Sequence, residues 1–183
     1  MSLKHKILSL FILCSCVFCF CASSDTLDAG KNATLHNNLG INYLKENNYV
    51  GAIKEFQIAI QLNPKSQVTA TYYYNLGMVY TRLRKYKDAK SCYEMALKIN
   101  PLYFRYYVDT VKTYKALNIL DKELQKHLKE KGNPLNDLYI GLIYIEQGKK
   151  SIGITTLDNF CANEPNLMIT DGVRTYLNQM SKN

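Results

Sequence analysis

The sequence predicts an all-α fold, a solenoid of about four helical hairpins followed by a capping helix. Three observations support this prediction. A pattern of residue types between Leu39 and Pro64 returns further along the chain, its apolar residues recur at intervals of three and four, and each copy ends at a proline. A long pattern that repeats is typical of a solenoid. Intervals of three and four place side chains on one face of a helix.

Seven positions define the repeated unit. In the first copy they are Leu39, Gly40, Tyr43, Ala52, Phe56, Ala59 and Pro64. A shift of 37 residues gives Leu76, Gly77, Tyr80, Ala89, Tyr93, Ala96 and Pro101. A looser third copy consists of Ile140, Gly141, Tyr144, Gly153, Leu157, Phe160 and Pro165. Seven equal offsets in two copies are hard to obtain by chance.

Each copy describes two amphipathic helices joined by a short turn. Gly40 and Ala52 are the smallest residues of the unit, and we expect them where the two helix axes approach closely. Tyr43 and Phe56 then fill the space between the helices. Proline lacks an amide donor and disfavours helical geometry in the residue before it, so Pro64 ends the second helix.

These residues resemble the tetratricopeptide repeat, a family of stacked helical hairpins that usually act as protein-binding scaffolds. The resemblance covers roughly Ala33 to Leu167 and implies a right-handed α-solenoid. The third unit departs from the family pattern. Glu123 and His127 occupy positions where a small residue and an aromatic residue are expected, so the pairing of this hairpin is the least well defined.

The boundaries follow from these units. Residues 1–24 are assigned to a signal segment, 25–32 to a tether, 33–167 to the repeat domain and 168–183 to the capping helix. The hairpins fall at about 33–66, 67–103, 104–133 and 134–167, with turns at Asn47-Asn48 and Gly148. The apolar stripe of the last segment consists of Ile169, Val173, Tyr176, Leu177 and Met180. Such a helix is needed because the last hairpin would otherwise expose its stacking face.

The N-terminal segment has the pattern of an export signal. Lys4 and Lys6 precede an apolar run at 7–22, which is typical of a secretory signal. Sixteen helical residues span roughly 24 Å, less than the ~30 Å hydrocarbon core of a bilayer. Three fates stay open: ordinary cleavage near Ala22, lipidation of Cys16 in a Leu13-Cys14-Ser15-Cys16 sequence that resembles a lipobox, or retention as an anchor. We therefore expect an exported protein, whether periplasmic, secreted or membrane-tethered.

The cysteines do not indicate a metal or redox site. Four of the six lie in the apolar run, namely Cys14, Cys16, Cys19 and Cys21. The other two, Cys92 and Cys161, belong to the second and fourth hairpins, with a whole hairpin between them. A disulfide requires α-carbons within about 7 Å, so we expect two unbridged thiols.

Charge and motifs argue against catalysis and nucleic-acid binding. The formal net charge is +8 at pH 7, with lysines interleaved with acidic residues along the helices, which is typical of a solvated face. His36 and His127 lack metal-ligand spacing, and no phosphate loop or nucleophile motif is present. We expect no enzyme activity, no cofactor, no metal and no nucleic-acid partner. Membrane contact is expected only through the N-terminal segment, if it is retained or lipidated.

The resemblance implies a concave face, lined by the first helix of each hairpin, that binds a protein or peptide partner. The offsets place Asn37, Ile41, Lys45, Tyr74, Met78, Arg82, Val108, Lys112, Leu138 and Leu142 on this face. The alternative for Tyr74, Met78, Leu138 and Leu142 is packing within the solenoid. Family members that clamp the carboxylate end of chaperone tails use lysine and asparagine where this chain has Asn37 and Ile41, which argues against that ligand.

The partner site is predicted on Asn37, Ile41, Tyr74, Met78, Arg82 and Lys112, centred on the first two hairpins. Tyrosine and arginine often dominate binding energy at interfaces, and methionine adapts to varied surfaces. The predicted function is an exported adaptor. The alternative is a membrane-tethered, pilotin-like assembly lipoprotein or a structural subunit of an envelope complex.

Overall fold

The computed structural model describes residues 28–130 and 132–182, and the regular structure within these ranges is helical throughout. Residues 28–45 belong to the first helix and include part of the predicted tether. The following helices are α2 (Tyr49–Leu62), α3 (Thr69–Arg82), α4 (Tyr86–Ile99), α5 (Phe104–Ala116), α6 (Leu120–Lys129), α7 (Asn136–Glu146), α8 (Lys150–Asn163) and α9 (Thr170–Met180). The predicted signal segment, with Cys16, lies outside the described residues.

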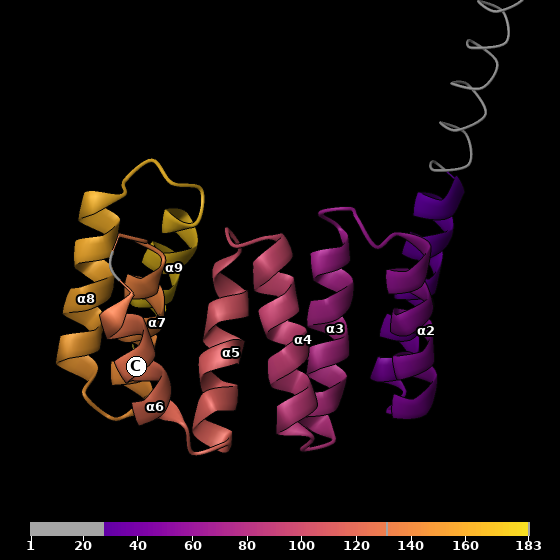
Figure 1. The fold of residues 1–183 in the computed structure, drawn as a ribbon, viewed down its shortest axis with the longest axis horizontal. Coiled ribbons are helices and arrows are strands. Elements are labelled where there is room, and N and C mark those ends of the chain that lie inside the picture. Colours follow the sequence, from indigo (N-terminus) through magenta and orange to yellow (C-terminus); the bar gives the residue numbers. More distant parts are fainter. Residues whose placement is uncertain (1–27, 131, 183) are drawn as a thin grey trace, which may run out of the picture.

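The helices form hairpins that stand side by side in a row (Figure 1). The pairs are the first helix with α2, α3 with α4, α5 with α6, and α7 with α8, followed by α9. This arrangement confirms the predicted all-α solenoid. None of the described helices has the length and apolar character required to span a bilayer.

The four turns within the hairpins share one conformation. Each contains a residue with positive φ: Asn47 (59°), Arg84 (57°), Asn118 (55°) and Gly148 (84°). In each turn the next amide donates to the carbonyl of a tyrosine five residues earlier, at 2.8 to 3.0 Å. This pattern is the Schellman motif, which satisfies carbonyl groups at a helix C-terminus. The turns predicted at Asn47-Asn48 and Gly148 are confirmed.

Glycine permits the close approach of paired helices in three hairpins. A Cβ atom added at Gly40 would lie 2.7 Å from the ring of Phe56, and one at Gly77 would lie 2.5 Å from the ring of Tyr93. At Gly141 it would lie 2.7 Å from Leu157. The prediction that Gly40 lies where two helices approach closely is therefore confirmed.

The third hairpin packs differently because it lacks this glycine. Val111, which is fully buried, takes its place on α5. Its expected partner sixteen residues later is His127, and that ring instead stacks on Tyr139 of α7, with ring centroids 4.0 Å apart and an interplanar angle of 8°. Helix α6 has ten residues and packs less extensively on α5 than α4 does on α3.

The loops between hairpins are closed by a recurring hydrogen bond. In each, a side chain donates to a backbone carbonyl six residues earlier, near the end of the preceding helix. The pairs are Thr69 with Asn63, Tyr107 with Pro101 (3.0 Å), Asn136 with Glu130 (2.8 Å) and Thr170 with Glu164 (2.6 Å). These bonds fix where α3, α5, α7 and α9 start.

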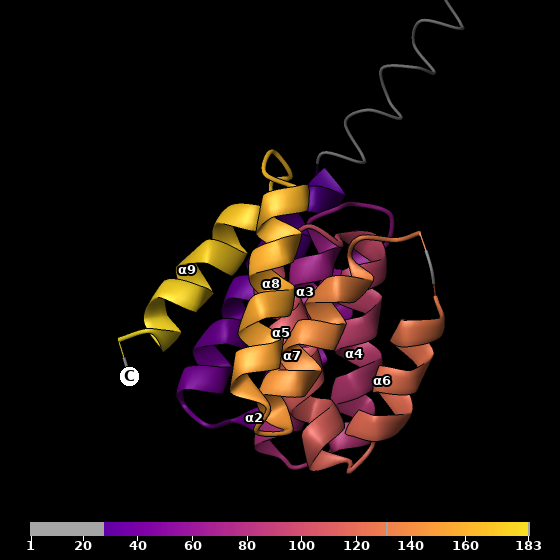
Figure 2. The ribbon, with the colours of Figure 1, turned by 90° about the vertical axis from the view of Figure 1, so that its left-hand side faces the viewer.

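Helix α9 packs against both α8 and α5. Ile169 and Val173 are buried, and the ring of Tyr176 makes an edge contact with Phe104 at 5.5 Å. Gly172 allows this approach, because a Cβ atom there would lie 3.0 Å from Cβ of Phe104. Figure 2 shows α9 on the side of the solenoid opposite α6. The predicted C-terminal helix is present, but it reaches back to the third hairpin instead of covering only the last one.

Cys92 and Cys161 are both buried and unbridged. Burial raises the pKa of the Cys92 thiol to about 12 and also raises that of Cys161. Both thiols therefore stay protonated at neutral pH, and because the thiolate is the reactive form of cysteine, they act as apolar packing groups.

Candidate functional site

A groove of about 600 Å³ lies between α5 and α9. Its walls include the buried side chains of Phe104, Val108 and Ile169. Tyr103 and Met168, from the loops that precede α5 and α9, also line it and are 53% and 77% exposed. Apolar side chains of this size, exposed beside an apolar wall, are typical of a binding groove.

Polar groups surround this apolar surface. Lys112, Asp171, Thr175 and Arg105 line the groove. Asp171 lies 3.5 Å from Arg174 on its own helix, and Arg105 is bonded to Asp109. Lys112 is exposed and has no ion-pair partner among the residues that the structure describes. The groove thus combines an apolar surface with a lysine that has no ion-pair partner within 28–130 and 132–182.

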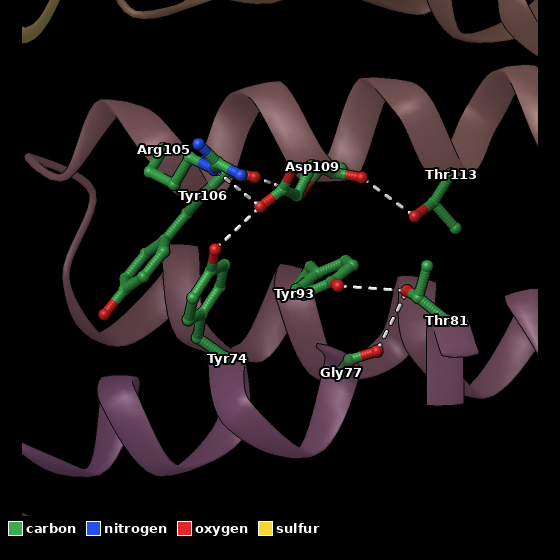
Figure 3. A network of polar contacts seen from close by, with 9 residues as sticks. Tyr74, Gly77, Thr81, Tyr93, Arg105, Tyr106, Asp109 and Thr113 are labelled. Atoms are coloured by element: carbon green, nitrogen blue, oxygen red, sulfur yellow. Dashed lines mark hydrogen bonds and ion pairs between the residues drawn. The ribbon is translucent and has the colours of Figure 1, made fainter. Parts of the chain in front are cut away.

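A polar network joins α3 to α5 (Figure 3). The Tyr74 hydroxyl donates to Asp109 Oδ2 at 2.7 Å, and Arg105 Nε donates to the same oxygen at 2.9 Å. Burial, together with the bond to Asp109, raises the pKa of Tyr74 above its ordinary value, so the hydroxyl remains a donor. The hydroxyl and carboxylate bond therefore holds two consecutive hairpins together.

Further bonds connect the first helices of the first two hairpins. Asn75 Nδ2 donates to Asn37 Oδ1 at 2.8 Å, and both residues are buried. The hydroxyl groups of Thr34 and Tyr72 lie 3.3 Å apart. Buried polar groups that satisfy each other fix the relative position of the elements that carry them, so the bond between Asn75 and Asn37 sets the register of the first two hairpins.

Comparison with known proteins identifies the repeat. Residues 31–101 match the family model described as tetratricopeptide repeat. Residues 31–101, which span the first two hairpins, are therefore identified as tetratricopeptide repeats. No curated protein sequence is significantly similar to it.

Solved structures show the same tetratricopeptide repeat fold at low sequence identity. A tetratricopeptide repeat protein from Parabacteroides merdae aligns with a TM-score of 0.53 and 16% identity, over 84% of this chain and 61% of that one. PilF from Pseudomonas aeruginosa gives 0.51 and 15%, over 79% and 67% of the two chains. MamA gives 0.50 and 22%, over 76% and 82%. Because the sequence identities are this low, the structural similarity shows a shared fold and nothing about function.

The predicted partner-binding residues lie in three different environments. Asn37 is buried in its bond to Asn75, and Leu138 and Leu142 are 0% and 2% exposed within the core. Ile41, Tyr74, Met78 and Val108 are half-buried or buried in packing contacts. Lys45, Arg82 and Lys112 are exposed. Lys112 and Val108 are brought together in the groove, whereas Lys45 and Arg82 lie at hairpin turns.

The sequence analysis missed Tyr103 and Met168. Tyr103 follows Leu102 in the loop after Pro101, and Met168 precedes the capping helix, so neither belongs to the repeated positions. The sequence offered one signal for them, namely an aromatic residue and a methionine that stand beside predicted helix starts. This signal indicates a groove only once α9 is known to pack on α5.

A second cavity, of about 510 Å³, lies between α4, α6 and the loop that leads to α7. His127 and Tyr139 line it, with Lys90 and Glu94 from α4, which are paired at 2.7 Å. Burial lowers the pKa of His127, so its ring is neutral near pH 7. Within 28–130 and 132–182, no group of three or more His, Cys, Asp or Glu side chains could hold a metal ion.

Proposed function

We propose that the protein is an exported scaffold that binds a segment of a partner protein in the groove between α5 and α9. The observation that carries the proposal is the exposure of Tyr103 and Met168 beside the buried wall of Phe104, Val108 and Ile169. Tyrosine supplies a large contact area at low entropic cost, and methionine adapts to varied partners. Proteins built from tetratricopeptide repeats generally act as scaffolds for protein binding, which supports a protein partner.

The groove also indicates what the partner presents. The apolar wall suits a branched or aromatic side chain, and Lys112 suits a carboxylate next to it. We therefore expect a short partner segment with an acidic residue close to an apolar one. Tyr74 contributes indirectly, because its bond to Asp109 holds α5 in place.

The groove is tested by recovering partners from an envelope extract with the protein and its variants. Tyr103→Ala combined with Met168→Ala should abolish recovery of a specific partner, and circular dichroism melts should remain within a few degrees because both side chains are exposed. Met95→Ala removes a methionine that is 37% exposed on α4, outside the groove, and should leave recovery unchanged.

A second double variant separates this site from the one first predicted on hairpins one and two. Tyr74→Ala with Arg82→Ala removes the Asp109 bond and an exposed cation. If this pair abolishes recovery while the melt is unchanged, and the Tyr103 and Met168 pair has no effect, the binding site lies on the first two hairpins. A strongly lowered melting temperature instead shows that Tyr74 has a packing role.

Export is proposed from the sequence, because Lys4 and Lys6 precede the apolar run. N-terminal sequencing of the protein recovered from cells tests it. A chain that begins between residues 22 and 26 indicates ordinary cleavage. A full-length chain in the cytosolic fraction would rule out export.

The second candidate is a membrane-tethered, pilotin-like assembly lipoprotein or a structural subunit of an envelope complex. Cys16, in a sequence that resembles a lipobox, favours it. Growth with a radioactive fatty acid should label the wild-type protein and leave a Cys16→Ser variant unlabelled. If neither is labelled, lipidation is excluded.

A further inference from the structure

The four hairpin turns lie along one edge of the solenoid, opposite the loops between hairpins (Figure 1). We call this the turn edge and define it as residues 45–50, 82–88, 115–122 and 146–152. It contains nine basic and four acidic residues, an excess of five positive charges. Sequence order spreads these lysines and arginines over a hundred positions, but the fold gathers them on one side.

Most of these cations have no counter-charge in the part of the chain that the structure describes. Lys115 pairs with Glu146 at 2.9 Å, and the Lys149 ammonium lies over the ring of Tyr144. Among the described residues, no ion pair involves any of the four cations of the second turn, Arg82, Arg84, Lys85 and Lys87. All four are exposed.

The use of arginine points to the same turn. The chain contains four arginines, and the two outside the turn edge are both paired, Arg105 with Asp109 and Arg174 with Asp171. Arg82 and Arg84 have no ion-pair partner among the residues that the structure describes. Arginine forms two parallel hydrogen bonds to a phosphate or carboxylate, which lysine cannot do.

Arg84 is also an exception in its backbone conformation. Its φ of 57° is in the left-handed region, and the equivalent residues of the other three turns are Asn47, Asn118 and Gly148. Asparagine and glycine adopt this conformation at low cost, whereas most other residues are strained in it. A strained residue is retained where the surrounding structure requires it or where its side chain has a function. The backbone of the turn itself accommodates asparagine elsewhere, so the arginine side chain is the feature that distinguishes it.

We propose that the turn edge docks on the anionic headgroups of a lipid bilayer, with Arg82 and Arg84 at the centre of the contact. A row of four turns along one edge matches an extended surface better than it matches a single peptide. Two exposed apolar residues on the same edge, Val50 (82% exposed) and Ile152 (52% exposed), suit insertion between headgroups. Basic residues near an anionic leaflet and amphipathic side chains at its interface are the two components of such binding.

Docking in this orientation leaves the partner groove accessible. No residue that lines the groove belongs to the turn edge. The described part of the first helix starts at the opposite edge (Figure 1). The contact is therefore separate from the proposed partner site.

The test is co-sedimentation of the full chain with vesicles of pure phosphatidylglycerol and of pure phosphatidylcholine. The ratio of the two partition coefficients is the readout, so that any affinity of the apolar N-terminal run for lipid in general cancels. We expect a ratio well above one that falls with added salt, because salt screens exposed charges. Arg82→Gln with Arg84→Asn should lower the ratio roughly 30-fold, from about a fivefold loss per charge removed.

The matched control removes two charges from the opposite edge, through Lys65→Gln with Lys98→Gln, and should change the ratio by less than about threefold, since exposed charges more than a Debye length from the surface are largely screened. A wild-type ratio near one overturns the proposal, as does an equal loss in both double variants. Arginine-dependent binding to poly-glutamate without binding to phosphatidylglycerol would also overturn it, and would assign the turn edge to an acidic protein. A melt of each variant verifies that it is folded.

Discussion

Replacing Gly77 with alanine should destabilise the protein, although alanine is the better helix former. The added Cβ atom would lie 2.5 Å from Cε1 and 2.7 Å from Cδ1 of Tyr93, which is well inside carbon–carbon contact distance. Tyr93 cannot easily move away. It is 2% exposed, its ring lies 5.6 Å from that of Tyr74, and its hydroxyl is 3.0 Å from Thr81 Oγ1.

Two opposing terms set the magnitude. Glycine in a helix interior costs about 1 kcal/mol relative to alanine, whereas overpacking of a core typically costs about 1 to 3 kcal/mol. The net loss for Gly77→Ala is then about 0 to 2 kcal/mol, and Gly77→Leu should reach or exceed the upper limit. Each 1 kcal/mol corresponds to roughly 2 to 4 °C in melting temperature for a domain of this size.

Thermal melts followed by circular dichroism measure this loss, and Gly30→Ala is the matched control. The nearest atom to a Cβ at Gly30 is Asn63 Nδ2 at 3.8 Å, so the same substitution meets no obstacle there. Gly30→Ala should leave the melting temperature unchanged or raise it slightly. If Gly77→Ala melts as high as this control, or Gly77→Leu as high as the wild type, the packing argument is wrong.

Three further predictions concern single features. Arg84→Asn should raise the free energy of unfolding by about 0.5 to 1 kcal/mol because it relieves a left-handed arginine, and Asn118→Arg should lower it; urea melts that rank these two in the reverse order would contradict this. Burial lowers the pKa of His127 below its ordinary 6.5, and the charge of Lys126 lowers it further, although the carboxylates of Glu123 and Glu130 raise it. As the pH falls, the unfolded chain therefore binds a proton at this histidine before the folded chain does. Stability should be full above pH 6.5 and decline below it, and His127→Phe should reduce that decline in urea melts taken across this range. Deletion of 169–183 should expose the apolar surface under α9 and cause self-association, which sedimentation velocity detects; a monomer of unchanged stability would show that α9 is dispensable.

The sequence predicted the helices and turns well because both depend on local patterns. Apolar residues at intervals of three and four mark the helix faces, and Asn47 and Gly148 mark turns because these residue types tolerate positive φ. The contact of Gly77 with Tyr93 was also accessible, since the repeated unit pairs its smallest and largest residues at a fixed offset.

The arrangement between hairpins was less accessible because it depends on contacts that no repeated position encodes. The Tyr74 hydroxyl could have faced a ligand, and only the position of Asp109, 35 residues later, shows that it is used within the solenoid. Similarly, α9 has an apolar stripe that would suit the end of the last hairpin. Its contact with α5 depends on Gly172 facing Phe104, and this determines the groove.

The third hairpin shows how one missing glycine changes the structure around it. Where the other hairpins place a bulky side chain over a glycine, α5 has Val111, whose side chain fills that space. The ring of His127 therefore turns to Tyr139 of α7, and its Nδ1 lies 3.0 Å from Asn136 Oδ1. Because Asn136 Nδ2 donates to the carbonyl of Glu130, its oxygen faces the histidine, and His127 Nδ1 must be the donor.

The same substitution explains the cavity between α4 and α6. With Val111 on α5, α6 cannot approach as closely as α4 approaches α3, and its interaction with α7 compensates through the stacked rings and the Asn136 bond. Space then remains on the side of α6 that faces α4, lined by His127, Tyr139 and the Lys90–Glu94 pair. Polar side chains at these positions are consistent with a cavity that water can enter, since buried charged groups require compensation. The departure of His127 from the repeat pattern thus accompanies the altered helix packing around Val111.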